Sequence, residues 1–551
     1  MYMYIVLGLC RWHVTEARCT CHSIKTFCTG ILQWLLLQGL LPRTKMAGVL
    51  SFVYNVSSIL VGVAVFLGLA VVLRYRRNLP PGPRGWPILG LLPKLLRLGH
   101  GYEFRSWLSD LSRRHDIYSL NIGGQLVVVV SQYTTIKVAF INPQAAARPP
   151  STLSADLKIF PNPHASGIVM SSGEKWSELR MYVMAALRGD RIGGKTFEDI
   201  VTSEAKHLVQ QIRNLNGRAF DPKSLLRRTT ANVMSTIALG RRFDDSDPRF
   251  QKFLDCLHLF SDTDGFGSLL GMVPFIQRLG SLIGFQEAKT ATVNAVTFLR
   301  EEVKQHQETL DFDNPRDAID VLLRGMLLRK RNYKKTHIDT DDIALTVFDL
   351  FLGGTESITS TLRWAFLHLV SQPDVQADIH AELATEVGLR RAPALSDQSK
   401  LHYTGATICE SQRIGCVVPL VGPHYVSEDT TMFGLNIPNG AIVVGDFWNM
   451  SRDLAIWQDS GDPDKFVPGR FLDESGRLDR RDKQLNVFSR GRRLCPGENV
   501  ARIQLFLLFS HLLHQFDFSL PRGEPPMRFK GDFKMTFSPK PYKIVATPRE
   551  W

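Results

Sequence analysis

The chain lacks the sequence features of several common protein classes. It has no closely spaced cysteine and histidine pairs of the kind that hold zinc, and no nucleic-acid-binding signature. We therefore do not expect it to bind DNA or RNA, although its net charge is +13. A basic surface is equally consistent with simple solubility, with anionic lipid or with an acidic partner. No internal repeat or low-complexity segment is present.

The eight cysteines do not form a disulfide framework. Four of them crowd the first 28 residues. The other four are scattered along the rest of the chain, as Cys256, Cys409, Cys416 and Cys495. Scattered single cysteines are typical of a reducing compartment, so we expect the main body of the protein to face one.

Long apolar runs are also scarce. Residues 31–41 are apolar but too short to span a bilayer, whereas residues 56–73 carry no charge and would extend about 27 Å as a helix. Arg74, Arg76 and Arg77 follow, and by the positive-inside rule they keep the C-terminal body in the cytosol. No small-residue cleavage site follows, which argues against a signal peptide. A buried core helix is the alternative.

The anchor helps to divide the chain. Pro80-Pro81-Gly82-Pro83 predicts a stiff, extended spacer that ends the helix and orients the body on the membrane. We hypothesise that Met46 is the native initiator, and that residues 1–45 are a gene-model extension or an unstructured N-terminus. Residues 46–79 are then the membrane anchor with its basic stop, and residues 80–551 form one large domain.

The periodicity of the body predicts a mainly α fold with minor β structure. A helix is expected over 102–115 and a hairpin over 118–130, with Gly123-Gly124 at its turn. A long helix begins near the acidic residues 340–342 and ends before Pro373, which starts another helix that ends near Gly388. Further helices are expected near 174–188, 198–215, 223–240, 285–308 and 315–330, and short strands near 437–444 and 541–547.

Cys495 lies in the most informative segment, residues 488–497, which read Phe-Ser-Arg-Gly-Arg-Arg-Leu-Cys-Pro-Gly. Nearby cations and the start of the helical run 500–513 both favour a thiolate, the form that acts as ligand or nucleophile. The glycines let the backbone approach something bulky and flat. Pro496 suits a first helical turn. A buried packing thiol is the alternative.

The spacing Phe-x-x-Gly-x-Arg-x-Cys-x-Gly resembles the haem-ligand loop of the cytochromes P450. This resemblance implies that Cys495 is the axial thiolate ligand of haem iron, with haem b as the cofactor. It also implies the cytochrome P450 fold for residues 80–551, preceded by a single-pass transmembrane helix.

The long helix contains Gly353 and Gly354, each of which costs a helix about 1 kcal/mol relative to alanine. Such a cost marks close approach to the backbone, a local opening of the helix or tight helix packing. Glu356 and Ser357 follow, and the segment resembles the family's distal helix, in which a carboxylate and an alcohol deliver protons to bound dioxygen. Threonine is usual at the position of Ser357. Serine keeps the hydroxyl but lacks the methyl group that stiffens χ1, so we expect competent but less tightly coupled oxygen activation.

Trp176 and Arg180 lie four residues apart on one helix face. Taken alone, the two residues could simply be a packed aromatic and a surface arginine. With the other motifs, they resemble the family's pair that binds a haem propionate. By the same resemblance His424 and Arg493 complete the propionate shell. His424 taken alone would be an ordinary surface or capping histidine.

Glu410 and Arg413 form an i,i+3 pair that is usually a solvated salt bridge. Their register resembles the family's Glu-x-x-Arg helix, in which the pair is buried and joins an arginine of a later Phe-x-Pro-x-Arg-Phe segment, here Arg470. Gly469 and Cys416 depart from common residues without touching this triad. We assign the triad a structural role.

Together these motifs imply a haem-dependent monooxygenase that uses dioxygen and electrons from NADPH–cytochrome P450 reductase, with cytochrome b5 as a further partner. The enzyme would sit in the endoplasmic reticulum membrane with its catalytic domain in the cytosol. Arg490 and Arg492 are candidates for docking an acidic reductase, or simply solvated arginines. A peroxide-rearranging isomerase and a non-catalytic haem-binding protein remain the alternatives.

The substrate is expected to be hydrophobic, because the segments expected to line the pocket are largely apolar. These segments are 151–172, the helices within 190–290, 348–354, 417–421 and the turn at Phe537. The chain is most similar to the second family of animal microsomal enzymes. Residues 306–311 and 417–420 resemble its fatty-acid-hydroxylating members. A fatty acid is therefore our first expectation, followed by a steroid, a retinoid or a xenobiotic.

Overall fold

The chain divides into two compact units, residues 1–78 and 79–551, and the helices and strands given below belong to the second. The computed structural model describes residues 65, 68, 78–83, 85–86, 89–98, 102–150, 164–261, 285–388, 390–457, 461–479, 484–523, 529–533 and 536–549. The expected extension (1–45) and nearly all of the expected anchor (46–79) lie outside these residues. Within them, no helix combines the length and apolar character needed to cross a bilayer.

Helices make up most of the second unit, as the sequence predicts. In chain order they are α4 (Leu92–Leu98), α5 (Tyr102–Arg114), α6 (Tyr133–Ile141), α8 (Gly173–Leu187), α9 (Phe197–Arg213), α10 (Pro222–Leu239), α11 (Pro248–Ser261), α14 (Phe285–Glu308), α15 (Ala318–Arg331), α16 (Thr340–Ser371), α17 (Pro373–Glu386), α18 (His402–Gly415), α19 (Phe447–Met450), α20 (Leu454–Trp457) and α21 (Glu498–Gln515). The expected helices are confirmed to within three residues at each end, while α4, α6, α11, α19 and α20 were not anticipated.

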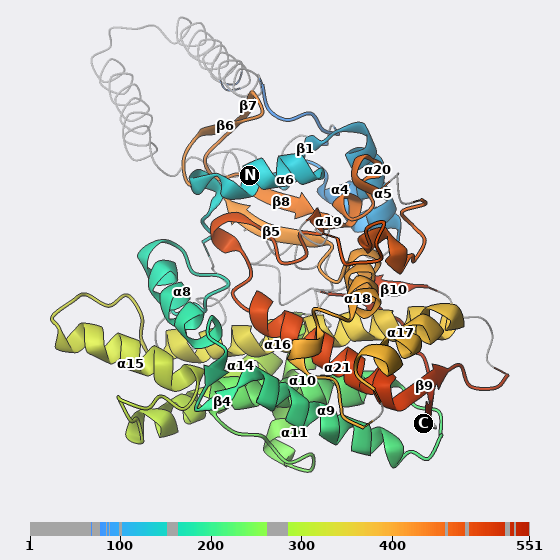
Figure 1. The fold of residues 1–551 in the computed structure, drawn as a ribbon. Helices are drawn as coiled ribbons and strands as arrows, with labels where there is room; N and C mark the ends of the chain where they lie inside the picture. The colour runs from blue at the N-terminus through green and yellow to red at the C-terminus, as the bar shows by residue number, and fades with distance from the viewer. Residues whose placement is uncertain are drawn as a thin grey trace, which may run out of the picture. The chain divides into compact units, whose positions relative to one another are not determined.

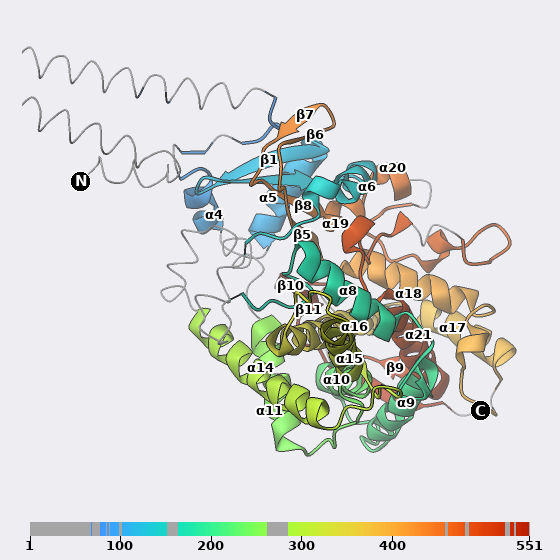
Figure 2. The same cartoon turned by 90° about the vertical axis from the view of Figure 1, so that its left-hand side faces the viewer.

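The main sheet has the strand order β1 (Ile117–Ile122), β2 (Gln125–Val130), β8 (Ile442–Asp446) and β5 (Leu420–Tyr425). The hairpin β1–β2 is antiparallel, β2 and β8 run parallel, and β5 returns antiparallel to β8. The sheet lies to one side of the long helices, above them in Figure 1, and the turned view in Figure 2 shows the same separation.

The remaining strands form two-stranded pairs. These are β3 (Arg191–Ile192) with β4 (Lys195–Thr196), β6 (Thr430–Met432) with β7 (Leu435–Ile437), β9 (Phe516–Ser519) with β12 (Val545–Pro548), and β10 (Gly531–Phe533) with β11 (Phe537–Pro539).

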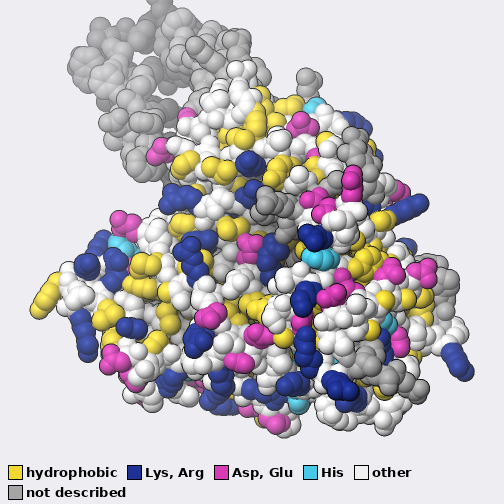
Figure 3. Space-filling model, viewed as in Figure 1, with side chains coloured by type: hydrophobic (Ala, Val, Ile, Leu, Met, Phe, Trp, Pro, Cys, Tyr) yellow, Lys and Arg dark blue, Asp and Glu magenta, His cyan; other side chains and the backbone are white. Residues whose placement is uncertain are grey.

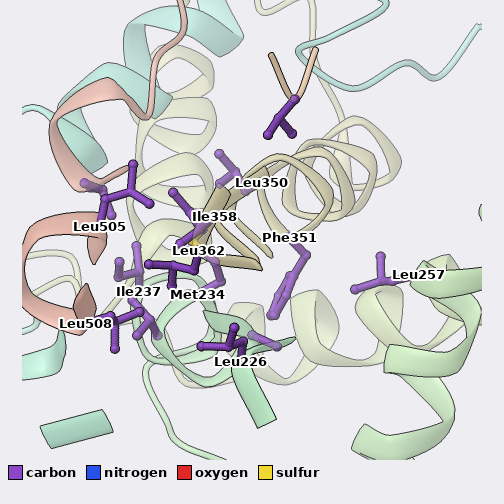
Figure 4. Packing of buried hydrophobic residues seen from close by; sticks show 14 of the residues in the cluster. Leu226, Met234, Ile237, Leu257, Leu350, Phe351, Ile358, Leu362, Leu505 and Leu508 are labelled. Carbon is purple, nitrogen blue, oxygen red and sulfur yellow. The ribbon is translucent and has the colours of Figure 1, made fainter. Parts of the chain in front are cut away.

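Helix α16 runs through the centre of the helical layer. Asp339 caps it, because its carboxylate accepts hydrogen bonds from the backbone N–H groups of Asp341 and Asp342 at 2.9 and 3.0 Å. Most of its 32 residues are buried, so this helix is apolar nearly all round rather than along one stripe. Figure 4 shows side chains of α10, α16 and α21 pointing toward one another, including those of Met234, Ile358 and Leu505. The core therefore forms around α16 and fixes its position.

A buried ion network locks α18 to the segment that follows α20. The carboxylate of Glu410 accepts two hydrogen bonds from Arg413, at 2.6 and 2.8 Å, and one from Arg470 at 3.1 Å. The backbone N–H of Val467 donates to the same carboxylate at 2.8 Å. The side chains of the three charged residues are fully buried. The geometry is that of the structural triad predicted from the sequence.

Candidate active site

The loop before α21 has the special backbone that its sequence suggests. Asn486, Ser489 and Gly491 adopt positive φ angles of 53°, 66° and 71°. At Gly491 a Cβ atom would overlap the carbonyl oxygen of Phe140, so only glycine fits against α6. The N–H of Cys495 then donates to the carbonyl of Phe488 at 2.9 Å. The loop thus holds the thiol in a fixed place just before the first turn of α21.

The electrostatics of Cys495 differ from the sequence-based argument. Burial raises the pKa of this thiol, and Glu498 raises it further, while the N–H of Gly497 and the Arg180 guanidinium lower it. Of the arginines beside it in sequence, Arg490 donates to the Tyr133 hydroxyl and Arg493 donates to backbone carbonyls. Arg180 and the N–H of Gly497 thus act in the direction predicted for nearby cations and the helix start, but burial outweighs both. A coordinated metal ion would supply the missing positive charge and deprotonate the thiol outright.

Four guanidinium groups gather on one side of this loop. Those of Arg180, Arg492 and Arg493 lie 5.6, 5.6 and 4.3 Å from the ring centre of Trp176. Burial lowers the pKa of Arg493 to about 9, with Arg148, Arg180 and Arg492 adding to the effect. Among the residues that the structure describes, none of the four has a carboxylate within ion-pair distance. Arg493 is buried and Arg148 and Arg180 are partly buried, so gathering these like charges is costly unless an anion binds there.

Arg493 and Arg148 bond only to backbone carbonyls in the described part of the chain. Arg493 donates to Ala146 at 2.8 Å, Ser171 at 2.7 Å and Ile168 at 3.4 Å. Arg148 donates to Val169 at 3.0 Å and Pro423 at 2.7 Å, and burial lowers its pKa to about 10. Sequence reasoning missed Arg148, because a single arginine before two prolines carries no recognisable signal.

His424 completes the cluster from strand β5. Its Nδ1 lies 2.8 Å from the carbonyl oxygen of Ala145, and its ring stacks on Phe140 with centroids 4.1 Å apart. Its Nε2 is buried and has no hydrogen-bond partner among the described residues. Burial, followed by the Arg148 charge, lowers the pKa of His424 to about 3. A bound carboxylate would satisfy this nitrogen and favour its protonated form.

These residues fit a ligand that carries both carboxylates and a metal. Near the thiol lie an indole, a ring nitrogen and four guanidiniums, and among the described residues the nitrogen has no hydrogen-bond partner and the guanidiniums have no ion-pair partner. Haem has this combination, because its propionates are carboxylates and its iron accepts a thiolate. The structure therefore brings together all five residues predicted to bind the cofactor, and it adds Arg148 and Arg492.

On α16 the two glycines have different environments. A Cβ on Gly354 would overlap the side chain of Met234, so this glycine allows α10 to pack closely against α16. A Cβ on Gly353 would meet nothing within 4 Å, so this glycine borders open space. The helix continues through both of them. Close packing against Met234 explains why position 354 is glycine. At position 353 glycine leaves an open helix face that could receive a ligand.

The predicted acid–alcohol pair lies on this helix, with its two members facing differently. Glu356 is buried at 5% exposure. The hydroxyl of Ser357 donates to the carbonyl of Gly353 at 2.6 Å, on the open side. Successive helical residues point about 100° apart, so the two side chains do not face one another. Their arrangement provides a hydroxyl at the open face and a carboxyl behind it.

Two carboxylates of α16 hold the segment 164–171 across the helix. Asp342 accepts from the N–H of Ser166 at 2.8 Å and from Lys175 at 2.7 Å. Asp349 accepts from the N–H of Val169 at 2.9 Å, and burial raises its pKa to about 7. The carbonyls of the same segment bind the arginines described above. The segment therefore links the open face of α16 to the arginine cluster.

The expected pocket lining is only partly described. Residues 151–163 and 262–284 lie outside the described ranges. Phe348 is buried and meets Phe260 edge-on at 5.4 Å, while Val418 is 38% exposed. Phe537 packs between Trp364 and Trp448, with ring centroids 5.2 and 5.1 Å apart. Phe537 therefore serves mainly to pack β11 against α16.

Of the two arginines considered for partner docking, only Arg492 is exposed. Arg490 is partly buried, where its Nη2 donates to the Tyr133 hydroxyl at 2.7 Å and its Nε donates to Asn486. It fastens the cysteine loop to α6 rather than facing solvent.

Comparison with known proteins gives a consistent result. Residues 80–546 match the family model for cytochrome P450. The chain is 33% identical over 521 residues to cytochrome P450 2U1 of Rattus norvegicus, a match that covers 89% of this chain and 95% of the relative. It is 34% identical over 504 residues to cytochrome P450 2D6 of Homo sapiens, covering 88% of this chain and 98% of that protein.

Proposed function

The chain belongs to the cytochrome P450 family, of animal microsomal family 2 type with monooxygenase activity, and from this premise we propose that it hydroxylates a hydrophobic substrate, foremost a fatty acid. The catalytic domain would comprise residues 80–551, and haem b would be its form of the family's haem-thiolate cofactor. The observation that supports this most strongly is the convergence of Cys495, the unpaired arginine cluster and the unsatisfied nitrogen of His424.

In this proposal Cys495 is the iron ligand. Trp176, Arg180, His424 and Arg493 hold the propionates, and Arg148 joins them. When bound, haem supplies dioxygen activation and oxygen transfer to a C–H bond, helped by electron donation from the thiolate. The segment 164–171 would hold the propionate side and the open face of α16 in register, because both sides bond to its backbone.

The chain's own contribution to the chemistry is proton handling and positioning. We propose that the hydroxyl of Ser357, which now donates to the Gly353 carbonyl, rotates toward the open face and donates a proton there. Glu356 would be the proton source behind this hydroxyl, and because the two side chains do not face one another, bound water would carry the proton between them. The reaction consumes one dioxygen, one NADPH and one proton, and it converts a substrate C–H to C–OH with release of one water.

The preference for a fatty acid rests on only one of the two segments that resemble fatty-acid-hydroxylating members. In the structure His306 lies 2.8 Å from the carboxylate of buried Asp317 and 2.7 Å from the Glu302 carbonyl. The likeness over 306–311 therefore concerns packing between α14 and α15 rather than substrate contact. Residues 417–420 lead into β5 and remain the segment that supports this substrate class.

Electrons would come from NADPH–cytochrome P450 reductase, with cytochrome b5 as a further partner. The exposed face around Arg492 suits such a protein, because the adjoining helices α6 and α8 carry exposed apolar side chains. Val138 and Ile141 on α6 are 50% and 53% exposed, and Met181 on α8 is 50% exposed. Residues 46–79 would anchor the enzyme in the endoplasmic reticulum membrane.

The test uses the full-length protein reconstituted with reductase and vesicles. A panel of fatty acids, steroids and retinoids is scored for NADPH-dependent hydroxylation, with Cys495→Ala as the inactive control. Hydroxylation of fatty acids in preference to the other classes is expected. Turnover of a lipid hydroperoxide without NADPH would instead favour the isomerase, and ligand binding without any turnover would favour a haem-binding protein.

A further inference from the structure

The end of α15 and the turn after it carry a dense group of positive charges. Residues 324–335 read Arg-Gly-Met-Leu-Leu-Arg-Lys-Arg-Asn-Tyr-Lys-Lys, with six basic residues and no acidic one. In the described part of the chain only Arg329 among them forms an ion pair, with buried Glu178 at 3.5 Å. Lys330, Lys334 and Lys335 are exposed. Like charges this close repel one another, so the group weakens the fold.

The turn is nevertheless well ordered. The N–H of Tyr333 donates to the carbonyl of Lys330 at 3.2 Å, and the N–H of Lys334 donates to that of Arg329 at 2.9 Å. These are the two bonds of a Schellman C-cap. The Arg329 guanidinium also donates twice to the carbonyl of Lys335, at 3.1 and 3.0 Å. The positive charges are therefore held on a fixed scaffold and are not a loose tail.

Tyr333 stands at the tip of this turn in an unfavourable conformation. Its φ is 52°, in the left-handed region where glycine or asparagine normally closes a helix. Its side chain is 100% exposed, so its ring makes no packing contact that would offset the strain. Figure 3 shows lysine and arginine side chains gathered around this end of α15, at the left edge of the molecule. Strain, charge repulsion and an exposed aromatic ring thus coincide at one point.

The tip borders the exposed face of α8. On one side of α8, Glu178 pairs with Arg329, and Gly325 lies so close to Tyr182 that a Cβ atom would overlap the ring. On the other side, Trp176 stacks with Arg492. Two basic groups therefore flank the same helix, and one of them adjoins the cysteine loop.

We propose that Tyr333 and the lysines around it form a second docking contact for the acidic reductase, on the far side of α8 from Arg492. The proposal rests on the proposed function, because it assumes an electron-donating partner. Tyrosine and arginine carry much of the binding energy in protein interfaces, and opposite charges speed encounter and fix orientation. A rigid tip beside the electron-receiving face suits a protein surface better than a lipid surface.

The experiment measures the affinity of the full-length haem protein for reductase directly, at low and high salt, separately from turnover. Tyr333→Gly removes the ring and relieves the strain, so it should unfold at higher denaturant yet bind reductase about tenfold more weakly. The double variant Lys330→Gln/Lys334→Gln should reduce the salt dependence of binding. Neither change should alter the spectrum of the reduced protein with carbon monoxide.

Phe433 provides a matched control. It stands at the tip of β6–β7 with φ 54° and 42% exposure, and no basic residue lies within three positions of it. Phe433→Gly likewise removes an aromatic ring at a positive φ angle, and it should leave reductase affinity unchanged. The proposal is overturned if Tyr333→Gly binds reductase like the wild type, or if it loses only binding to phosphatidylserine vesicles. Absence of NADPH-dependent turnover alongside a changed affinity would contradict the proposed function and not the contact.

Discussion

Replacement of Glu410 tests how much the buried ion network stabilises the fold. One carboxylate oxygen accepts three hydrogen bonds, from Arg413, Arg470 and the N–H of Val467, and the other accepts one from Arg413. In Glu410→Gln the amide oxygen can keep the first position, but its NH₂ group then faces the Arg413 donor at the second. Two buried guanidiniums also lose the negative charge of Glu410.

Breaking one partner of a buried ion pair costs about 3–5 kcal/mol, so Glu410→Gln should lose at least about 3 kcal/mol of unfolding free energy. The assay is denaturant unfolding followed by haem absorbance and tryptophan fluorescence. Asp110→Asn is the matched control, because Asp110 and Arg113 have the same i,i+3 spacing at 3.4 Å but are 50% and 75% exposed. An exposed pair of this kind is worth about 0–0.5 kcal/mol. Equal losses in the two variants would refute the buried-network reasoning.

Three further predictions concern α16. Gly353→Ala should stabilise the helix by up to about 1 kcal/mol and weaken substrate binding, whereas Gly354→Ala should destabilise it by displacing Met234; denaturation and substrate titration of both variants check this. Asp349 has a pKa of about 7 in the fold against 3.8 unfolded, so its contribution to stability is greatest below pH 4 and is lost as pH rises to 7. Asp349→Asn keeps an acceptor for the N–H of Val169 but has no titrating carboxyl. Its free energy of unfolding should therefore rise by about 4 kcal/mol relative to that of the wild type between pH 4 and pH 7. Parallel pH profiles of the two proteins would disprove this. Ser357→Thr should raise product formed per NADPH and Ser357→Ala should lower it, so equal ratios would remove this hydroxyl from the mechanism.

The sequence predicts the helices well because their signals are local. Asp339 and the acidic residues after it mark the start of α16, and Pro373 marks its end. The pairing of β2 with β8 could not be foreseen, since it joins residues 127–130 to residues 442–445 across most of the chain. Neither strand carries a local signal that names its partner.

The sequence names candidate site residues that the structure brings together, but it does not predict their electrostatics. Resemblance located Cys495, yet the direction of the neighbouring arginines depends on three positive φ angles that the residue types only partly imply. Arg148 is isolated in sequence and joins the cluster only through folding. Asp349 could have been found, because it is the one charged residue in the apolar stretch 343–352. A single carboxylate in a buried helix needs a partner, and here that partner is the N–H of Val169.

The most direct test of the central claim is the absorption spectrum of the reduced full-length protein with carbon monoxide. If Cys495 is the thiolate ligand of haem iron, the wild type should show the strongly red-shifted band of thiolate-bound haem, and Cys495→Ala should lose it. A wild-type spectrum without that band, or a red-shifted band that persists in Cys495→Ala, would contradict the account.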